Sequence, residues 1–131
     1  MKFFVRVGVL VLMLLFLAAG LGFDQNTAEQ FWAKGVEHAA QGNFNEAKEE
    51  FEKALKVDPF YESVKEFLRI IEDVAVKKIE SKTAIHLFKG AAYVIKGQTG
   101  EAISDYTKAI EMNPGFVEAY FNRGLAYVQV G

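Results

Sequence analysis

Cysteine is absent from this chain of 131 residues, and proline occurs only twice. Without thiols the chain forms neither disulfides nor thiolate metal sites. Histidine is also scarce, and neither His38 nor His86 has a carboxylate or a second histidine at the spacing that metal ligands take on a helix. These absences leave little basis for a metal site or for acid-base catalysis.

Basic residues are not in excess, since 15 lysines and arginines stand against 17 acidic residues and the net charge is −2. Nucleic-acid binding normally requires a basic face, so we expect no nucleic-acid partner. Glu49 and Glu52 have Lys53 and Lys56 four residues later, which is typical of a solvated helix face. No phosphate loop, nucleophile elbow or paired-acid motif is present in the sequence. We therefore expect no enzyme activity, no cofactor and no metal.

The longest apolar run lies at the N-terminus. Lys2 and Arg6 precede an apolar stretch over 7–17, and small residues follow over 18–22. This order of a charged, an apolar and a small-residue part is typical of a secretory signal. The pattern predicts that residues 1–22 are a signal peptide.

A membrane anchor is the alternative for the same segment. Residues 7–23 are 17 uninterrupted uncharged residues, the lower limit for a helix that spans a bilayer. In that case residues 3–23 form an N-terminal hydrophobic helix that associates with the membrane. In both cases the basic end stays inside, so the rest of the chain is expected to be exported to a periplasmic or other extracytoplasmic space. A buried core helix fits less well, because the run is apolar on every side.

The remainder of the chain repeats itself. Eight residues recur 55 positions later, and a third copy begins 34 positions after the second. Repeats of this length indicate stacked helical hairpins, which usually form surfaces that hold other molecules. The recurring pairs are Gly35 and Gly90, Gly42 and Gly97, Glu46 and Glu101, Ala47 and Ala102, Phe51 and Tyr106, Lys53 and Lys108, Ala54 and Ala109, and Pro59 and Pro114.

The spacing within one copy explains the sizes of its residues. A first apolar stretch ends at a Gly-Asn pair and a second ends at an Asp-Pro pair, so the pattern predicts helix, turn, helix, stop. Phe31 and Gly35 share one face of the first helix, and Phe51 lies between Ala47 and Ala54 on one face of the second. A large ring opposite a residue without a side chain lets two helices interlock.

These positions make the chain similar to the tetratricopeptide repeat family. That family's 34-residue pattern places an aromatic, a small residue and an aromatic on the first helix, then alanine, aromatic and alanine on the second, with a closing proline. His38 and His86 take two of the aromatic positions, and Lys34 and Lys89 take positions usually held by leucine. The residues that fit the pattern, and are expected to pack the repeats, are Phe31, Gly35, Ala47, Phe51, Ala54, Pro59, Gly90, Tyr93, Ala102, Tyr106, Ala109, Pro114, Tyr120, Gly124 and Tyr127.

The resemblance implies an all-α fold, a right-handed solenoid of helical hairpins that forms an α-α superhelix. Because the 55-residue offset exceeds the family's period, 21 residues lie between the two full repeats. The expected parts of the repeat domain 23–131 are a full repeat over 28–61, an inserted helix over 62–82, a full repeat over 83–116 and a half repeat over 117–131.

The inserted segment has a helical stripe of apolar residues and a charged opposite face. No glycine or proline occurs between Phe60 and Lys89, so this helix either continues into the next repeat as one long helix or stays separate and interrupts the regular stacking. We interpret it as an extra packing helix rather than as a dedicated binding element. The apolar stripe comprises Val64, Phe67, Leu68, Ile71, Val74, Ala75 and Ile79.

The resemblance also implies a binding surface, because the first helix of each repeat lines the concave side in this family. Some members clamp a peptide's terminal carboxylate there, but only Asn122 is in keeping with that clamp, so we do not transfer it. An apolar surface suits an amphipathic helix or an apolar peptide, unless the inserted helix or the N-terminal segment covers it. The nearly all apolar contact residues expected on this face are Trp32, Val36, Ala39, Leu87, Ala91, Val94, Phe121, Leu125 and Val128.

The last expected helix, over 117–130, is apolar on both sides, whereas repeat arrays normally end in a polar face. A longer array, self-association through this helix, or a covering subunit would each explain it. Together these patterns predict an exported scaffold that binds a protein or peptide without covalent chemistry. The alternatives are a membrane-anchored structural subunit or assembly factor of a membrane complex, and an enzyme with an unrecognised site.

Overall fold

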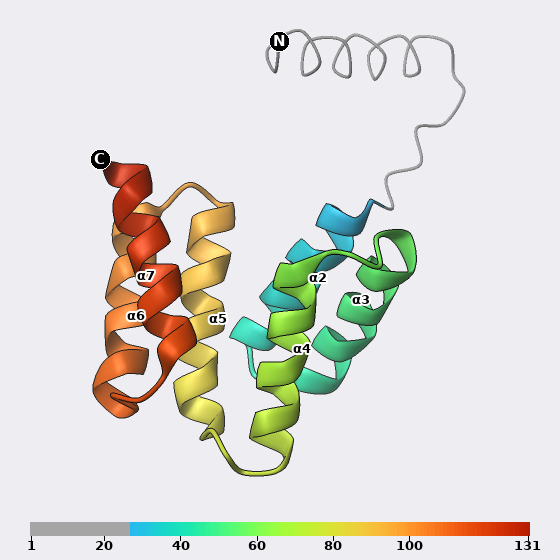
Figure 1. The fold of residues 1–131 in the computed structure, drawn as a ribbon, viewed down its shortest axis with the longest axis horizontal. Coiled ribbons are helices and arrows are strands. Elements are labelled where there is room, and N and C mark those ends of the chain that lie inside the picture. The colour runs from blue at the N-terminus through green and yellow to red at the C-terminus, as the bar shows by residue number, and fades with distance from the viewer. Residues whose placement is uncertain (1–26) are drawn as a thin grey trace, which may run out of the picture.

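The computed structural model describes residues 27–131, which fold into α-helices joined by turns, without strands in that range (Figure 1). The all-α expectation is therefore confirmed for the part of the chain that the structure describes. The predicted signal peptide or anchor, and with it the N-terminal hydrophobic helix, lies outside the described residues. The helices are α2 (Ala28–Ala40), α3 (Phe44–Val57), α4 (Glu62–Ala75), α5 (Ser81–Ile95), α6 (Thr99–Met112) and α7 (Val117–Val130).

Two antiparallel hairpins, α2 with α3 and α5 with α6, form the framework. The Gly35 Cα on α2 faces the ring of Phe51 on α3, and a Cβ at Gly35 would lie 2.4 Å from Cε1 of that ring. Gly90 on α5 stands in the same relation to Tyr106 on α6, again at 2.4 Å. Each hairpin is therefore closed by a ring that occupies the space a side chain would need.

The residues that match the repeat pattern are mostly buried in the two hairpins and exposed in the turns and on α7. Gly35, Ala47, Phe51 and Ala54 are buried in the first hairpin, and Phe31 is half-buried. In the second hairpin Gly90, Ala102, Tyr106 and Ala109 are buried and Tyr93 is half-buried. The exposed members are Pro59 and Pro114 in the turns, and Tyr120, Gly124 and Tyr127 on α7.

Helix ends explain where the elements begin and stop. At the start of α2, Thr27 and Gln30 form a capping box, each side chain accepting a bond from the other's backbone N–H at 3.2 Å. At its end, Gly42 takes the left-handed conformation with φ of +81°. The N–H groups of Gly42 and Asn43 then reach back to Ala39 and His38, which is the Schellman motif.

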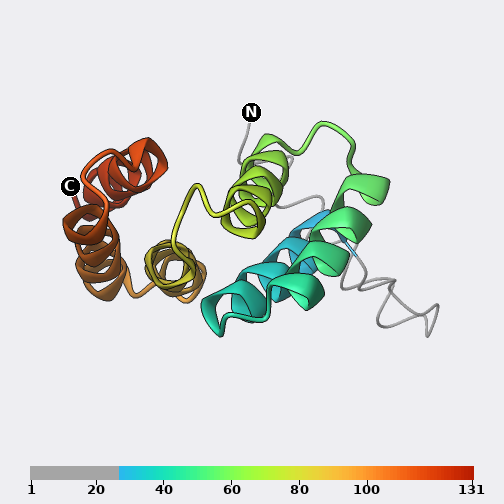
Figure 2. The same cartoon turned by 90° about the horizontal axis from the view of Figure 1, so that it is seen from below.

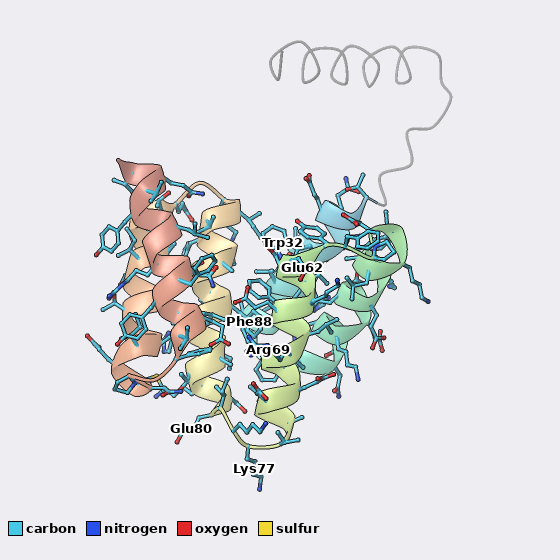
Figure 3. All side chains as sticks on the ribbon, in the orientation of Figure 1. Trp32, Glu62, Arg69, Lys77, Glu80 and Phe88 are labelled. Atoms are coloured by element: carbon cyan, nitrogen blue, oxygen red, sulfur yellow. The ribbon has the colours of Figure 1, made fainter. Side chains whose placement is uncertain are left out.

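The same motif separates α4 from α5, with Lys77 in place of glycine. Lys77 has φ of +60°, and the backbone N–H of Lys78 donates to the carbonyl of Asp73 at 2.8 Å. The arrangement in which residues 62–82 merge with the next repeat into one long helix is therefore wrong, because α4 ends at Ala75 (Figure 3). The break was hidden in the sequence because a lysine adopts the conformation that glycine favours.

Helix α4 packs against α3 and α5, while α2 also contacts α5 directly. Its Phe67 stacks on Trp32 of α2 with ring centroids 6.3 Å apart and meets Phe88 of α5 edge-on at 5.3 Å. Figure 2 shows the resulting row of helices, with α2 and α3 at one end, α5 in the middle and α6 and α7 at the other end. In residues 27–131 no helix is long and apolar enough to cross a bilayer.

Candidate functional site

A groove of about 180 Å³ lies between α4 and α7, with α5 at its base. One wall comes from α4 and Trp32 of α2, and the other from α7. We call this space the α4–α7 groove. Its lining residues are Trp32, Ser63, Glu66, Phe67, Ala91, Val94, Tyr106, Phe121, Asn122, Leu125, Ala126 and Gln129.

Five of the nine contact residues expected from the sequence line this groove. Phe121 and Leu125 are the most accessible of the five, with 60% and 49% of their surface exposed, whereas Ala91 is almost covered at 4%. Val128 is 78% exposed on α7 but lies outside the groove lining. The five lining residues are Trp32, Ala91, Val94, Phe121 and Leu125.

The placement of Val36, Ala39 and Leu87 on a contact surface is wrong for this structure. All three are 0% exposed and belong to the same buried cluster as Phe67 of α4. The prediction assumed that the inner faces of the first helices stay open. Instead α2 packs on α5 and α4 lies against both hairpins, which is the covered arrangement that the sequence also allowed.

Charged and polar side chains form the rim of the groove. Arg69 of α4 donates to Glu118 of α7 at 2.6 Å, so an ion pair joins the two walls. Burial raises the pKa of Glu66, the negative charge of Glu118 adds to that rise, and Arg69 opposes it. The side-chain amide of Asn122 donates to the Glu118 carbonyl at 2.8 Å. An ion pair therefore links the two helices that wall the groove.

The indole Nε1 of Trp32 is buried and has no hydrogen-bond partner within residues 27–131. No other side-chain polar atom of the described groove lining is in this position. The indole N–H can only donate, and an unpaired buried donor costs about 1–3 kcal/mol. The ring is held between Tyr61, at a centroid distance of 6.1 Å, and Phe67. The aromatic wall thus covers this donor with its own side chains.

A second cleft, of about 520 Å³, lies between α2, α5 and α6. His86 and Asp105 line it and pair across the α5–α6 hairpin, with Nδ1 and Oδ1 2.9 Å apart. Sequence reasoning missed this pair because its members are 19 residues apart and on different helices. The sequence did contain one signal, because Lys34, His86 and Lys89 depart from the repeat pattern. The structure shows that all three line this cleft. Within residues 27–131 no group of three histidine or acidic side chains could hold a metal ion.

Comparison with known proteins identifies two matching family models. The model described as "Tetratricopeptide repeat" matches residues 28–61, and the model described as "TPR repeat" matches residues 90–131, so together they cover more than half of the chain. No solved structure matches the chain.

One curated relative is described as the probable UDP-N-acetylglucosamine–peptide N-acetylglucosaminyltransferase SPINDLY of Hordeum vulgare. It is 28% identical over 97 residues, which is 73% of this chain and 9% of that protein. This chain therefore spans less than a tenth of that relative's length, and the activity in its name is a statement about that protein alone.

Proposed function

Because this chain is a tetratricopeptide repeat protein, a family of interaction modules, we propose that it binds an apolar peptide or an amphipathic helix in the α4–α7 groove. The observation that carries the proposal is the exposure of Phe121 and Leu125, 60% and 49%, opposite Trp32 and Phe67 in one lining. Covering such apolar surface contributes about 25 cal/mol per Å². No covalent step is needed for recognition of this kind.

The polar residues at the edge of the groove support a peptide as the ligand. A peptide carries a carbonyl acceptor at every residue and an N–H donor at nearly every one, whereas a purely apolar ligand has neither. The polar rim residues Ser63, Asn122 and Gln129 offer partners to a peptide backbone. The groove thus combines an apolar wall with donors and acceptors at its edge, as peptide sites commonly do.

The proposal is tested by selecting peptides from a phage-displayed library on the 131-residue protein and titrating them against variants. Leu125→Asp places a charge in the groove and is expected to weaken the selected peptides about tenfold or more. Val128→Asp is the matched control, because Val128 is exposed on the same helix outside the groove. Equal binding to the wild type and Leu125→Asp, with unchanged circular dichroism, would reject the groove as the site.

We also propose that the protein is exported, a proposal supported by the sequence pattern over residues 1–22 described above. Mass spectrometry of the protein recovered from its own cells tests it. Loss of residues 1–22 is the outcome expected for a cleaved signal peptide. Recovery of an intact Met1 in the membrane fraction would instead favour the anchored subunit, and recovery of an intact Met1 from the cytosol would contradict export.

A further inference from the structure

The cleft of about 520 Å³ between α2, α5 and α6 holds an excess of positive charge. Four lysines line it, against two acidic residues, Glu37 and Asp105. We call this space the lysine cleft. It shares no lining residue with the α4–α7 groove, so it is a separate site. The four lysines are Lys34 on α2, Lys89 on α5, Lys96 directly after α5, and Lys108 on α6.

The protein leaves most of this charge uncompensated. None of the four lysines forms an ion pair with a residue of 27–131, whereas other lysines there pair with glutamates three or four residues away on their own helix. Of the two carboxylates in the lining, that of Asp105 is taken up by the Nδ1 of His86 at 2.9 Å, and Asp105 is only 7% exposed. Glu37 alone remains to balance four ammonium groups.

Repeat packing does not account for the polar residues of the lysine cleft. Lys34 and Lys89 take positions that the repeat pattern fills with leucine, and His86 takes an aromatic position. Both lysines are exposed, so neither contributes to the core. Three of the four departures from the pattern noted in the sequence therefore line one cleft, and only His38 lies elsewhere. Their shared location indicates a use other than packing.

The kind of cation in the lining favours phosphate as the ligand group. A lysine ammonium is a point charge with three rotatable donors, which can contact the tetrahedral oxygens of a phosphate from any side, whereas the planar fork of arginine suits bidentate recognition. Among the described residues no arginine lines the cleft. One phosphate monoester carries a charge of about −1.5 to −2, so four ammonium groups match two phosphates rather than one.

We propose that the lysine cleft binds a small molecule that carries two phosphate groups or a diphosphate. Lys34, Lys89 and Lys108 contact the phosphate oxygens from three helices, and Ala92 and Tyr93 contact the rest of the ligand. The volume lies in the range of small-molecule sites. A cleft lined by one sign of charge focuses its potential, so this attraction is local, whereas the net charge of −2 disfavours a nucleic acid as the source of the phosphates.

Inorganic pyrophosphate is the probe, titrated into the 131-residue protein by isothermal calorimetry without divalent cations. Saturable binding at one site is expected. The double variant Lys34→Gln with Lys89→Gln removes one charge from α2 and one from α5, and is expected to weaken binding about tenfold or more. Glu37→Gln removes the opposing charge and is expected to tighten binding by about twofold.

The matched control is the double variant Lys56→Gln with Lys82→Gln. It changes the net charge by the same amount, and both residues are exposed outside the lysine cleft, so the affinity is expected to stay unchanged. Absence of saturable binding, or equal weakening in the two double variants, would overturn the proposal. Loss of pyrophosphate binding in Leu125→Asp would place the probe in the α4–α7 groove instead, and its displacement by a single-stranded oligonucleotide would assign the cleft to nucleic acid.

Discussion

Arg69 and Glu118 are 49 residues apart in the sequence, yet they form an ion pair of 2.6 Å that joins α4 to α7. Arg69 is 57% exposed along its side chain, so solvent screens the pair. Its structural importance lies in its position rather than its strength, because it links the two helices that form the walls of the α4–α7 groove.

Glu118→Gln is expected to change the free energy of unfolding by less than about 1 kcal/mol, because exposed ion pairs contribute little. The same variant should increase hydrogen exchange at the amides of α7, since the contact that ties this helix to α4 is weakened. Mass-spectrometric exchange measures the effect, with α3 as the internal reference. Unchanged exchange in α7 would show that packing against α6 and α5 fixes this helix without the ion pair.

Gly90→Ala and Gly124→Ala are expected to change stability in opposite directions. The methyl group at residue 90 collides with the Tyr106 ring, and overpacking of this kind costs about 1–3 kcal/mol. At residue 124 the methyl group meets no atom of residues 27–131, so the gain in helix propensity, about 1 kcal/mol, remains. Urea unfolding of both variants tests the prediction, and a shift of equal sign in the two would refute it.

Lys77→Gly is expected to stabilise the protein by up to about 1 kcal/mol, because φ of +60° is unfavourable for a residue with a Cβ and costs glycine little. Lys78→Gly serves as the control, since it removes a neighbouring lysine outside the left-handed region and should give no gain. Thermal melts followed by circular dichroism compare the two. A lower melting temperature for Lys77→Gly than for wild type would disprove the strain.

Glu66→Gln is expected to raise the melting temperature at pH 7 but not at pH 4. Burial holds the pKa of Glu66 above its ordinary value of 4.5, with Glu118 raising it further and Arg69 opposing. The stability that the protonated carboxyl supplies is complete below pH 4.5 and is lost as the pH rises through the folded-state pKa. Melts at both pH values check this, and an equal gain at pH 4 would point to a cause other than ionisation.

The hairpins could be predicted from the sequence because their determinants are local. Gly35 and Phe51 lie on neighbouring helices within one repeat, and the turn between them is marked by Gly42, so spacing alone indicated that the two helices pair. The end of α4 could not be predicted in this way. Lys77 adopts a conformation that no sequence pattern marks, and the bonds that stabilise it are made by backbone groups.

The candidate site was predictable only in part for a different reason. Trp32, Phe121 and Leu125 were recognised as apolar positions on an inner face, and all three line the α4–α7 groove. Val36 and Leu87 have the same pattern but are buried, because burial depends on where the inserted helix and the neighbouring hairpin pack. Periodicity shows which face of a helix is apolar, but it does not show what covers that face.

The two faces of α4 differ, because Val64 and Ile70 are buried in the core whereas Ser63 and Glu66 line the groove. The interlocked hairpins depend on Gly35, Gly90 and the rings that cover them, and the inner face of α4 packs on one of those rings, with Phe67 and Phe51 centroids 6.0 Å apart. Substitutions at Ser63 or Glu66 can therefore alter which ligands enter while the repeat framework stays intact. An extra helix between two repeats thus gives the protein an outer face that can diversify while its inner face stays fixed by the core.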